Sequence, residues 1–272
     1  MILFVASKND AAAMNIAERL IAKYGFGRGA ETYDGNPVFS KKLSNGKTAN
    51  LIYIDIDSIR TQSTVFPSPV ELLIFLSRHK SLSGKPTLSV HTPGNLGKAE
   101  LGGLPRRVSV SPASAMKEAL RAMKVAKEET GLEYEVCYEC THHGPSLNIP
   151  TMFAELGSSE KQWADPKAAE AVAKGALTAA SAEHVYSTAL GIGGPHYNAK
   201  FTRKALETET AFGHIVPKYA VSELDSEVLQ QCVDRTVEPV KKVVIDWKGV
   251  TGADKNQLLR LLAETGLEIE KI

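Results

Sequence analysis

Four of the seven histidines lie in three segments rich in glycine and proline, and each segment directly follows an apolar run. Imidazole is the commonest zinc ligand in proteins and also serves as a general acid or base near neutral pH. We therefore expect these histidines to form one chemical site if the fold brings the segments together. The segments are His91-Thr92-Pro93-Gly94-Asn95, Thr141-His142-His143-Gly144-Pro145-Ser146 and Gly191-Ile192-Gly193-Gly194-Pro195-His196-Tyr197.

A catalytic zinc ion takes three protein ligands and leaves one position for water. We predict that His91, His142 and His196 bind zinc, and that a carboxylate such as Glu139 or Glu155 can complete the set. Each histidine taken singly also fits another role, as a loop side chain that caps backbone groups. Their occurrence in three comparable loops favours the functional interpretation over this alternative.

His142 and His143 are neighbours in the sequence, and neighbouring side chains point to opposite faces of a strand. We therefore expect one ring to face the site and the other to support it or to line a groove. We assign both histidines to the catalytic group, together with Glu139 as a ligand or base.

The glycines of the third segment allow a ligand to approach the backbone closely. Gly193 and Gly194, together with Asn95, are therefore predicted to bind substrate, with N–H groups facing an anion or oxyanion. Pro195 and His196 stand where the nucleotide-binding glycine motifs need glycine or a Lys-Ser/Thr pair. This departure argues against nucleotide hydrolysis, and plain turns are the alternative interpretation of these glycines.

Lysines and arginines gather after two of the histidine segments. Lys200 and Arg203 follow His196 and are predicted to contact phosphate groups. Both groups of cations also fit the ordinary surface of a solvated helix, and neighbouring glutamates favour that alternative for the second group. The second group comprises Arg106, Arg107, Lys117, Arg121, Lys124 and Lys127.

The three cysteines are an odd number, which fits a reducing compartment better than a set of disulfides. Cys137 and Cys140 form a lone C-x-x-C pair, and alternation along a strand turns their side chains to opposite faces. We expect Cys137 to pack in the core, and Cys140 is a secondary candidate for a ligand or nucleophile.

The other three histidines have weaker links to chemistry. We expect His79 to end an amphipathic helix, where it interacts with the helix dipole. His184 is predicted to lie on a helix surface or to pack there. His214 follows a glycine and precedes an apolar run, as a residue at a strand boundary does.

Apolar runs that alternate with helical patterns predict the frame that positions these segments. The alternation predicts an α/β fold with a largely parallel sheet flanked by helices, and ligands bind such sheets at the carboxyl ends of the strands. Capping residues followed by proline predict helix starts at Ser68-Pro69, Ser111-Pro112 and Asp165-Pro166. The strand-like runs are Ile2–Val5, Asn50–Ile56, Thr87–His91, Tyr134–Tyr138, Met152–Leu156, Thr188–Ile192 and Lys242–Ile245.

No shift in composition marks a domain boundary. We therefore expect residues 1–272 to form a single α/β domain, with a subregion from about Ser222 onward. The polar, glycine-rich residues between Gly25 and Asn50 are predicted to form a hairpin or an insertion at the sheet edge.

The composition is that of an ordinary globular protein: 43% of the 272 residues are apolar and 23% are charged. A formal net charge of +1 gives no overall attraction to nucleic acid or to membranes, so any basic surface must be local. No stretch approaches the roughly 20 apolar residues of a membrane span, and the first apolar run is too short for a signal segment. We expect a cytoplasmic protein with no membrane partner.

The three histidine segments, together with Gly213-His214 and the opening residues Ile2 to Asp10, resemble the D-aminoacyl-tRNA deacylases of the archaeal and plant type. The resemblance spans nearly the whole chain. It implies a zinc-dependent enzyme in which an activated water hydrolyses the ester between a D-amino acid and tRNA, as a proofreading and detoxification activity. It also implies a fold similar to the phosphorylase and peptidyl-tRNA hydrolase group.

Two other functions fit the same residues. A zinc-dependent peptidase or amidase of the same broad fold would act on small substrates without tRNA. A non-catalytic protein that binds RNA or metal would lose binding, but no turnover, when His142 or His143 is replaced. For the deacylase we expect D-aminoacyl-tRNA as substrate, a monomer, and no stable protein partner.

Overall fold

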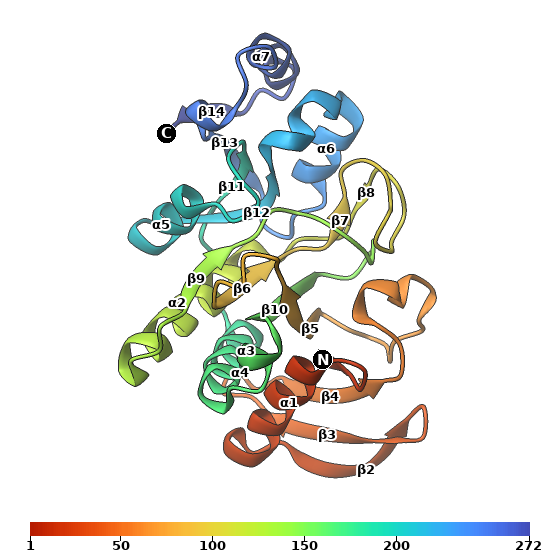
Figure 1. Ribbon diagram of the computed structural model, residues 1–272. Coiled ribbons are helices and arrows are strands. Elements are labelled where there is room, and N and C mark those ends of the chain that lie inside the picture. The colour runs from red at the N-terminus through yellow and green to blue at the C-terminus, as the bar shows by residue number, and fades with distance from the viewer.

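The computed structural model describes all residues from 1 to 272 and contains two main sheets (Figure 1). A short ribbon of β7 (Gly94–Asn95) and β8 (Arg107–Val108) lies outside both sheets. The smaller sheet has four strands in the order β12 (Thr210–Val216), β11 (Ser187–Ile192), β13 (Val240–Ile245), β14 (Glu268–Lys271). The larger has eight, in the order β2 (Gly27–Tyr33), β3 (Asn36–Lys42), β4 (Thr48–Ile54), β1 (Ile2–Ser7), β5 (Leu72–Lys80), β10 (Thr151–Ser158), β6 (Thr87–His91), β9 (Glu135–Tyr138).

Most neighbouring strands run parallel. In the larger sheet β1 pairs in parallel with β4 and β5, β5 with β10, and β6 with β9, whereas β6 and β10 are antiparallel. All three pairs of the smaller sheet are parallel. The predicted α/β fold with a largely parallel sheet is confirmed, and so is the hairpin between Gly25 and Asn50, since β2 and β3 pair at the sheet edge.

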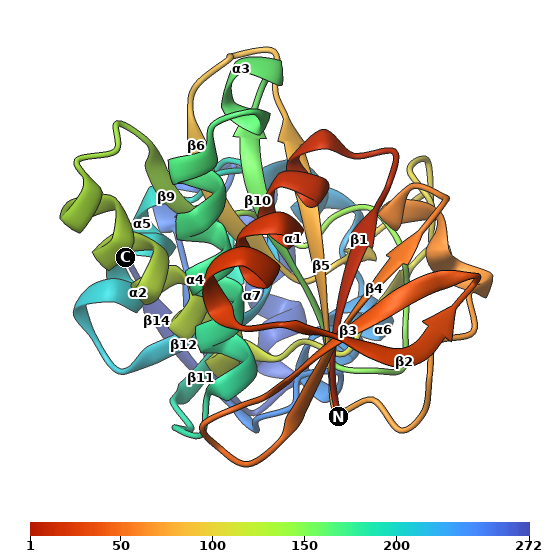
Figure 2. The same ribbon diagram turned by 90° about the horizontal axis from the view of Figure 1, so that it is seen from below.

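Helices flank both sheets. In the view from below, α1 and α4 lie against one face of the larger sheet (Figure 2). No helix of the structure is long and apolar enough to cross a membrane. The helices are α1 (Ala11–Tyr24), α2 (Ala113–Thr130), α3 (Glu160–Trp163), α4 (Pro166–Ser181), α5 (Ala199–Glu207), α6 (Ser226–Asp234) and α7 (Lys255–Ala263), with 3-10 turns η1 (Ser58–Ser63), η2 (Lys218–Glu223) and η3 (Trp247–Gly249).

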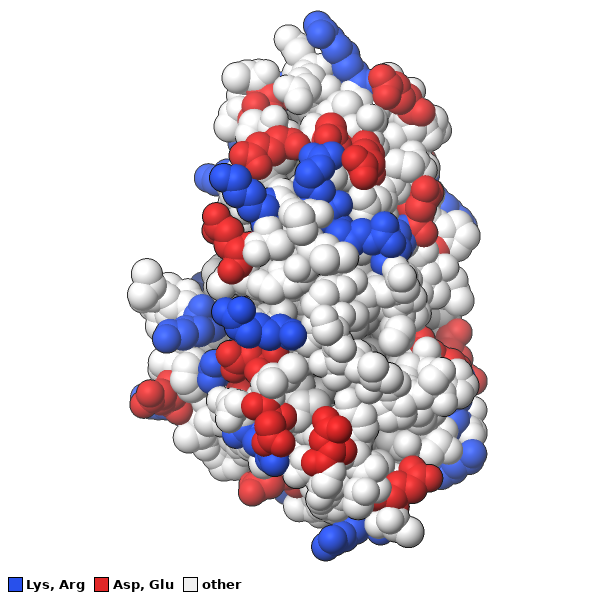
Figure 3. Space-filling model, turned by 90° about the vertical axis from the view of Figure 1, so that its right-hand side faces the viewer, with Lys and Arg blue, Asp and Glu red and all other residues white.

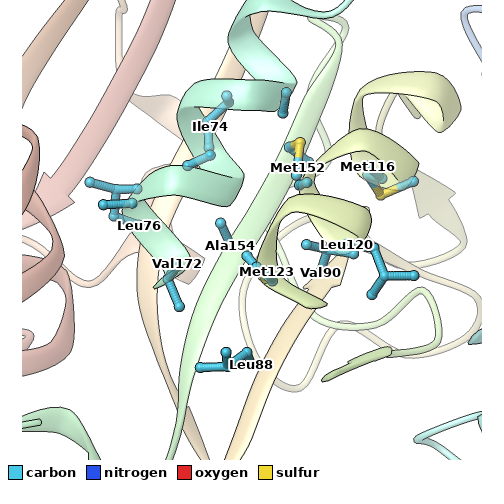
Figure 4. Close-up of a cluster of buried hydrophobic side chains, with 14 of the residues drawn as sticks. Ile74, Leu76, Leu88, Val90, Met116, Leu120, Met123, Met152, Ala154 and Val172 are labelled. Atoms are coloured by element: carbon cyan, nitrogen blue, oxygen red, sulfur yellow. The ribbon is translucent and has the colours of Figure 1, made fainter. Parts of the chain in front are cut away.

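Alternate residues of the central strands point into two separate cores. Phe4 and Ile74 pack on the helix side of the larger sheet, while Val5 and Phe75 pack on the opposite side. Because both faces are buried, these strands are continuous apolar runs rather than alternating ones. Figure 4 shows the helix-side core, in which side chains of α2 and α4 lie against β5, β6 and β10. This packing fixes the strand ends that carry the histidine segments.

One predicted helix is wrong. The capping pattern at Ser68-Pro69 precedes β5, not a helix. Leu72 to Leu76 are five consecutive buried apolar residues. They form a central strand that pairs with β1 and β10 and packs its two faces into separate cores. His79 consequently lies near the end of a buried strand, and its expected role at a helix terminus is also wrong. The other two proline-marked starts are confirmed at α2 and α4.

The basic side chains of α2 do not share one environment. Lys124 is exposed, as expected, but Lys117 is buried, and its Nζ lies 2.5 Å from the Thr208 carbonyl oxygen. The Lys117 ammonium also lies 3.9 Å from the centroid of the Tyr186 ring. The solvated-surface interpretation is therefore wrong for Lys117, because this side chain connects α2 to the segment before β12.

Candidate active site

The three histidine segments meet at one place in the fold. His91 ends β6, His142 and His143 follow β9, and His196 follows β11. The centroid of the His142 ring lies 4.3 Å from that of His91, 4.3 Å from that of His143 and 4.4 Å from that of His196. The structure thus brings all four predicted histidines into contact, and His142 is at the centre of the group.

Glycine allows these segments to approach so closely. Gly94 has φ of +154°, and a Cβ there would lie 2.5 Å from the Cα of Val108. A Cβ on Gly144 would lie 2.2 Å from the backbone nitrogen of Gly103. The Gly94 N–H donates to the His143 carbonyl oxygen at 2.7 Å, which ties the first segment to the second. Larger residues at Gly94 and Gly144 would separate the backbones that carry the histidines.

Two buried carboxylates lie behind the rings. Glu139 Oε2 is 2.9 Å from His196 Nε2 and 3.8 Å from His142 Nε2. Glu155, on β10, has Oε1 3.7 Å from His91 Nε2. Both carboxylates named from the sequence therefore contact the histidine group, each from a different strand.

The neighbouring histidines lower the pKa of both carboxylates. Burial by itself raises the pKa of Glu139, but the hydrogen bond from His196 and the nearby imidazoles hold that pKa well below its usual value. The pKa of Glu155 is also lowered: burial raises it, but the nearby His79 and His91 rings outweigh burial. Both groups are therefore anions at neutral pH.

Burial acts on the central imidazoles in the opposite sense. It lowers the pKa of His142 well below its usual value and that of His143 to about 4. The neighbouring imidazoles lower both values further. For His196, burial lowers the pKa, but hydrogen bonds with Cys140 and Glu139 raise it to about 10. The site thus combines neutral rings at its centre with a cationic ring paired to Glu139 at its side.

A further histidine joins the site without having been predicted there. His79 Nδ1 lies 3.3 Å from Glu139 Oε1 and 3.4 Å from Glu155 Oε2, and its Nε2 lies 2.6 Å from the Tyr197 hydroxyl. Burial lowers the pKa of His79, but the two carboxylates raise it above its usual value. His79 was missed because the sequence pattern predicted a helix where the structure has β5. Had β5 been assigned as a strand, the strand-end rule that selected the other segments would have selected His79 too.

Cys140 and Tyr219 border the group on another side. Cys140 Sγ lies 3.3 Å from His196 Nδ1 and 3.3 Å from the Tyr219 hydroxyl. Cys137 is buried away from solvent, as expected. Tyr219 belongs to η2, about twenty residues beyond His196, and no motif in the sequence marks it. Cys140 remains a candidate metal ligand because its sulfur lies beside His196 and within reach of His142.

The donor set fits a metal ion. Three groups have ligand atoms that all lie within 4.8 Å of one another. Both ring nitrogens of His91 are buried without a hydrogen-bond partner, which is costly unless a ligand takes up their lone pair or proton. Imidazole, thiolate and carboxylate are the ligands that zinc prefers. The groups are His91, His142 and His143; Cys140, His142 and His196; and His79, Glu139 and Glu155.

The predicted substrate-binding residues take different positions. Asn95 lines a cleft beside the histidines, but its Nδ2 donates to the carbonyl oxygens of Gly102 and Leu104. The N–H groups of Gly193 and Gly194 donate to backbone carbonyls of β12 and η3, so in this structure they are not free to bind an anion.

The predicted phosphate contacts also stand apart from the histidines. Lys200 and Arg203 lie on α5 and line neither of the clefts that reach the histidines. Lys200 Nζ is 2.6 Å from Asp246 Oδ1, and Arg203 is exposed.

His214 and His184 lie outside the ring cluster. His214 is buried within β12, where its Nδ1 lies 3.1 Å from the Thr141 hydroxyl and its Nε2 3.2 Å from the Arg235 carbonyl oxygen. It supports the residue that precedes His142. His184 is exposed, and its Nε2 lies 3.3 Å from a carboxylate oxygen of Glu209.

This polar, histidine-rich site lies beside the carboxyl ends of the parallel strands β6 and β9, and its donors could hold a metal ion. Residues 66–270 match the family described as D-aminoacyl-tRNA deacylase. The chain is 40% identical to a D-aminoacyl-tRNA deacylase of Pyrococcus furiosus over 276 residues, with 100% of both chains covered. It is 35% identical to one of Methanosarcina acetivorans over 283 residues, with 99% and 92% covered.

A solved structure is also similar over the whole chain. It is described as a conserved protein of unknown function, with a TM-score of 0.86 and 30% identity, and the match covers 100% of this chain and 95% of that one. Together these matches show that the chain belongs to the D-aminoacyl-tRNA deacylase family, as the sequence resemblance indicated.

Proposed function

We propose that this protein hydrolyses the ester that joins a D-amino acid to the terminal ribose of tRNA, as a proofreading step that yields free tRNA and a free D-amino acid. The observation that carries the proposal is the cluster of His91, His142, His143 and His196 in a member of this family. Two buried carboxylates back the cluster: Glu139, which follows β9, and Glu155, within β10.

We propose zinc as the cofactor, with His91, His142 and His196 as ligands. His142 is common to the group that contains His91 and the group that contains His196. To act as a ligand, His196 would give up the proton that its pairing with Glu139 favours. The neutral state that burial imposes on His142 is the state in which imidazole binds a metal. His142 Nδ1 lies 2.8 Å from the Cys140 carbonyl oxygen, and this contact directs the Nε2 lone pair away from the backbone. When bound, zinc supplies a nucleophile at neutral pH by lowering the pKa of water.

His143 and Glu139 are the proposed catalytic groups of the chain itself. The Nδ1 of His143 bonds to the Gly144 carbonyl oxygen, so its Nε2 carries a lone pair that accepts a hydrogen bond from the attacking water and orients it. Glu139 holds the His196 ring and keeps negative charge beside it. In the reaction the water oxygen bonds to the ester carbon, the bond to the ribose oxygen breaks, and the ribose oxygen takes up the proton.

Binding of tRNA requires only local positive charge. On the face in Figure 3, basic and acidic side chains are interspersed around a broad uncharged area, in keeping with the net charge of +1. We propose Arg203, which is exposed, as a phosphate contact; Lys200 would have to leave Asp246 to make one. The proposal includes action as a monomer in the cytoplasm, where tRNA is charged.

The test is the release of amino acid from D-Tyr-tRNA and L-Tyr-tRNA by the purified, zinc-loaded protein. The proposal predicts release of D-tyrosine and protection of the L-ester. Hydrolysis of small amides with neither tRNA ester cleaved would contradict it and favour a peptidase or amidase.

A further inference from the structure

Two clefts reach the histidine cluster from different sides. We name the first the strand-end cleft; it has a volume of about 410 Å³ and includes Asp10, Ser77, His79 and Glu155. We name the second the loop cleft; it has a volume of about 560 Å³ and includes Lys98, Glu100, Tyr219 and Glu223. The side chains common to both are Leu101, His142, His143 and His196.

If a bond is cleaved at the histidines that both clefts share, the two groups joined by that bond lie one in each cleft. In an aminoacyl-tRNA ester, those partners are the aminoacyl group and the terminal adenosine. Leu101 is 55% exposed between the clefts, and its carbonyl oxygen accepts a hydrogen bond from the Gly144 N–H, so it forms a fixed divider. The chemistry of each cleft then decides which partner it takes.

The strand-end cleft has the chemistry for the aminoacyl group. Its carboxylates Asp10 and Glu155 are almost fully buried, and the hydroxyl groups of Ser7 and Ser77 line the same cleft. Asp10 accepts hydrogen bonds from the N–H groups of Ala13 and Arg78, and Glu155 faces His79. An α-ammonium group is a compact cation with three N–H donors, to which the remaining lone pairs of these oxygens can accept. Two cations, Arg78 and Lys80, also line the cleft, and Arg78 is held by Asp57 at 3.8 Å and by the Asn9 carbonyl oxygen at 3.1 Å.

The loop cleft has the chemistry for a nucleoside. Tyr219 is 60% exposed there, and an exposed aromatic ring is the usual surface on which a protein stacks an unpaired base. The Tyr219 hydroxyl lies 3.3 Å from His196 Nδ1, so a base stacked on this ring has its ribose beside the histidines. Glu223 offers a carboxylate for ribose hydroxyls, and the exposed Lys98 lines the cleft, where it can meet the next phosphate.

We propose that the loop cleft binds the terminal adenosine of tRNA, with the adenine base stacked on Tyr219, and that the strand-end cleft binds the D-aminoacyl group. The inference rests on the proposed function for the identity of the substrate. It assigns to Tyr219 and to each cleft a part in substrate binding.

The first experiment measures binding of adenosine 5′-monophosphate to the full-length protein by titration calorimetry. Tyr219→Ala is expected to weaken binding by roughly five- to a hundredfold, the loss typical of a removed base-stacking ring. Tyr219→Phe keeps the ring and is expected to bind nearly as the unchanged protein does. Asp10→Asn, in the strand-end cleft, serves as the matched control and should leave the affinity for the nucleotide unchanged.

Two results would overturn the assignment. One is equal affinity of Tyr219→Ala and the unchanged protein for the nucleotide. The other is an equal loss in Tyr219→Ala and Tyr219→Phe, which would mean that the hydroxyl contact with His196, not stacking, is what matters. A thermal melt of each variant identifies any that fails to fold, and Tyr219→Leu then replaces it.

The same variants separate this inference from the proposed function. Nucleotide binding needs no turnover, so binding that depends on the Tyr219 ring supports the cleft assignment even if no tRNA ester is cleaved. Deacylation with no nucleotide binding at Tyr219 would support the function and overturn the assignment. In the active protein, Tyr219→Ala is expected to raise KM for D-Tyr-tRNA more than it lowers kcat.

Discussion

At the scale of single residues, the site depends on one central imidazole. His142 contacts three other histidine rings and belongs to two of the three groups that fit a metal. Its burial keeps it neutral, and its Nδ1 is occupied by the backbone. Removing this ring leaves the other histidines without a common neighbour.

We expect His142→Ala to lose most of the bound zinc and to lower deacylation at least a hundredfold, the scale typical for loss of a positioned acid, base or ligand. The measurement is metal content after dialysis together with the rate of D-Tyr-tRNA hydrolysis. His184→Ala is the matched control, because that ring is exposed and lies outside the cluster, beside Glu209 and Tyr186. Zinc content that stays at the unchanged level in His142→Ala would contradict the assignment of this ligand.

His91, His142, His143 and His196 were predictable from the sequence because each lies close to glycine and proline in a segment that follows an apolar run. His79 and Tyr219 were not. His79 was missed because the helix predicted after Ser68-Pro69 hid the strand that carries it, and its contacts with Glu139, Glu155 and Tyr197 join residues far apart in the chain. Tyr219 lies on a 3-10 turn, a kind of element that periodicity does not reveal.

At the scale of elements, the close approach of two loops positions the histidines. Gly144 packs against Gly102 and Gly103 with no room for a side chain, and its N–H donates to the Leu101 carbonyl oxygen at 2.9 Å. At Gly144 the absence of a side chain therefore serves the contact between the two backbones.

Gly144→Ala is expected to lower the unfolding free energy by about 1–3 kcal/mol, the usual cost of overpacking, and to lower activity by moving His143. Denaturant unfolding and the deacylation rate measure both effects. Gly27→Ala is the control, because a Cβ there meets nothing within 4 Å. If Gly144→Ala were as stable and active as Gly27→Ala, the loops would not need their close approach.

At β5 a local helix-start signal gave the wrong prediction. Ser68-Pro69 has the residues of a helix start, yet β5 follows it. Its backbone pairs with β1 and β10, and its alternate side chains pack into the two cores on opposite faces of the sheet. Long-range strand pairing therefore overrides local capping preference at this position. At α4 the same kind of signal is correct, since Asp165 accepts hydrogen bonds from the N–H groups of the first turn.

At the scale of the whole molecule, a buried lysine makes stability depend on pH. Burial lowers the pKa of Lys117 from 10.5 to about 8, so the folded state holds this proton less tightly than the unfolded chain does. The destabilisation is therefore fully present below about pH 8 and is relieved as pH rises toward the unfolded value.

We expect the unfolding free energy of the unchanged protein, relative to that of Lys117→Met, to increase by on the order of 1 kcal/mol between about pH 7 and about pH 9.5. Chemical denaturation of both proteins across this range measures the difference and cancels the other titrating groups. Lys124→Met is the control, because Lys124 is exposed on the same helix. A relative stability that is flat or falls with pH would contradict the buried charge.

The central claim is metal-assisted hydrolysis of the D-ester, and one measurement tests it most directly. The rate of amino-acid release from D-Tyr-tRNA and L-Tyr-tRNA is followed with the purified protein as isolated, after chelation, and after zinc is returned. The account predicts that only the D-ester is cleaved, that chelation abolishes cleavage, and that zinc restores it. A chelated, metal-free protein that cleaves the D-ester at the original rate would contradict the account.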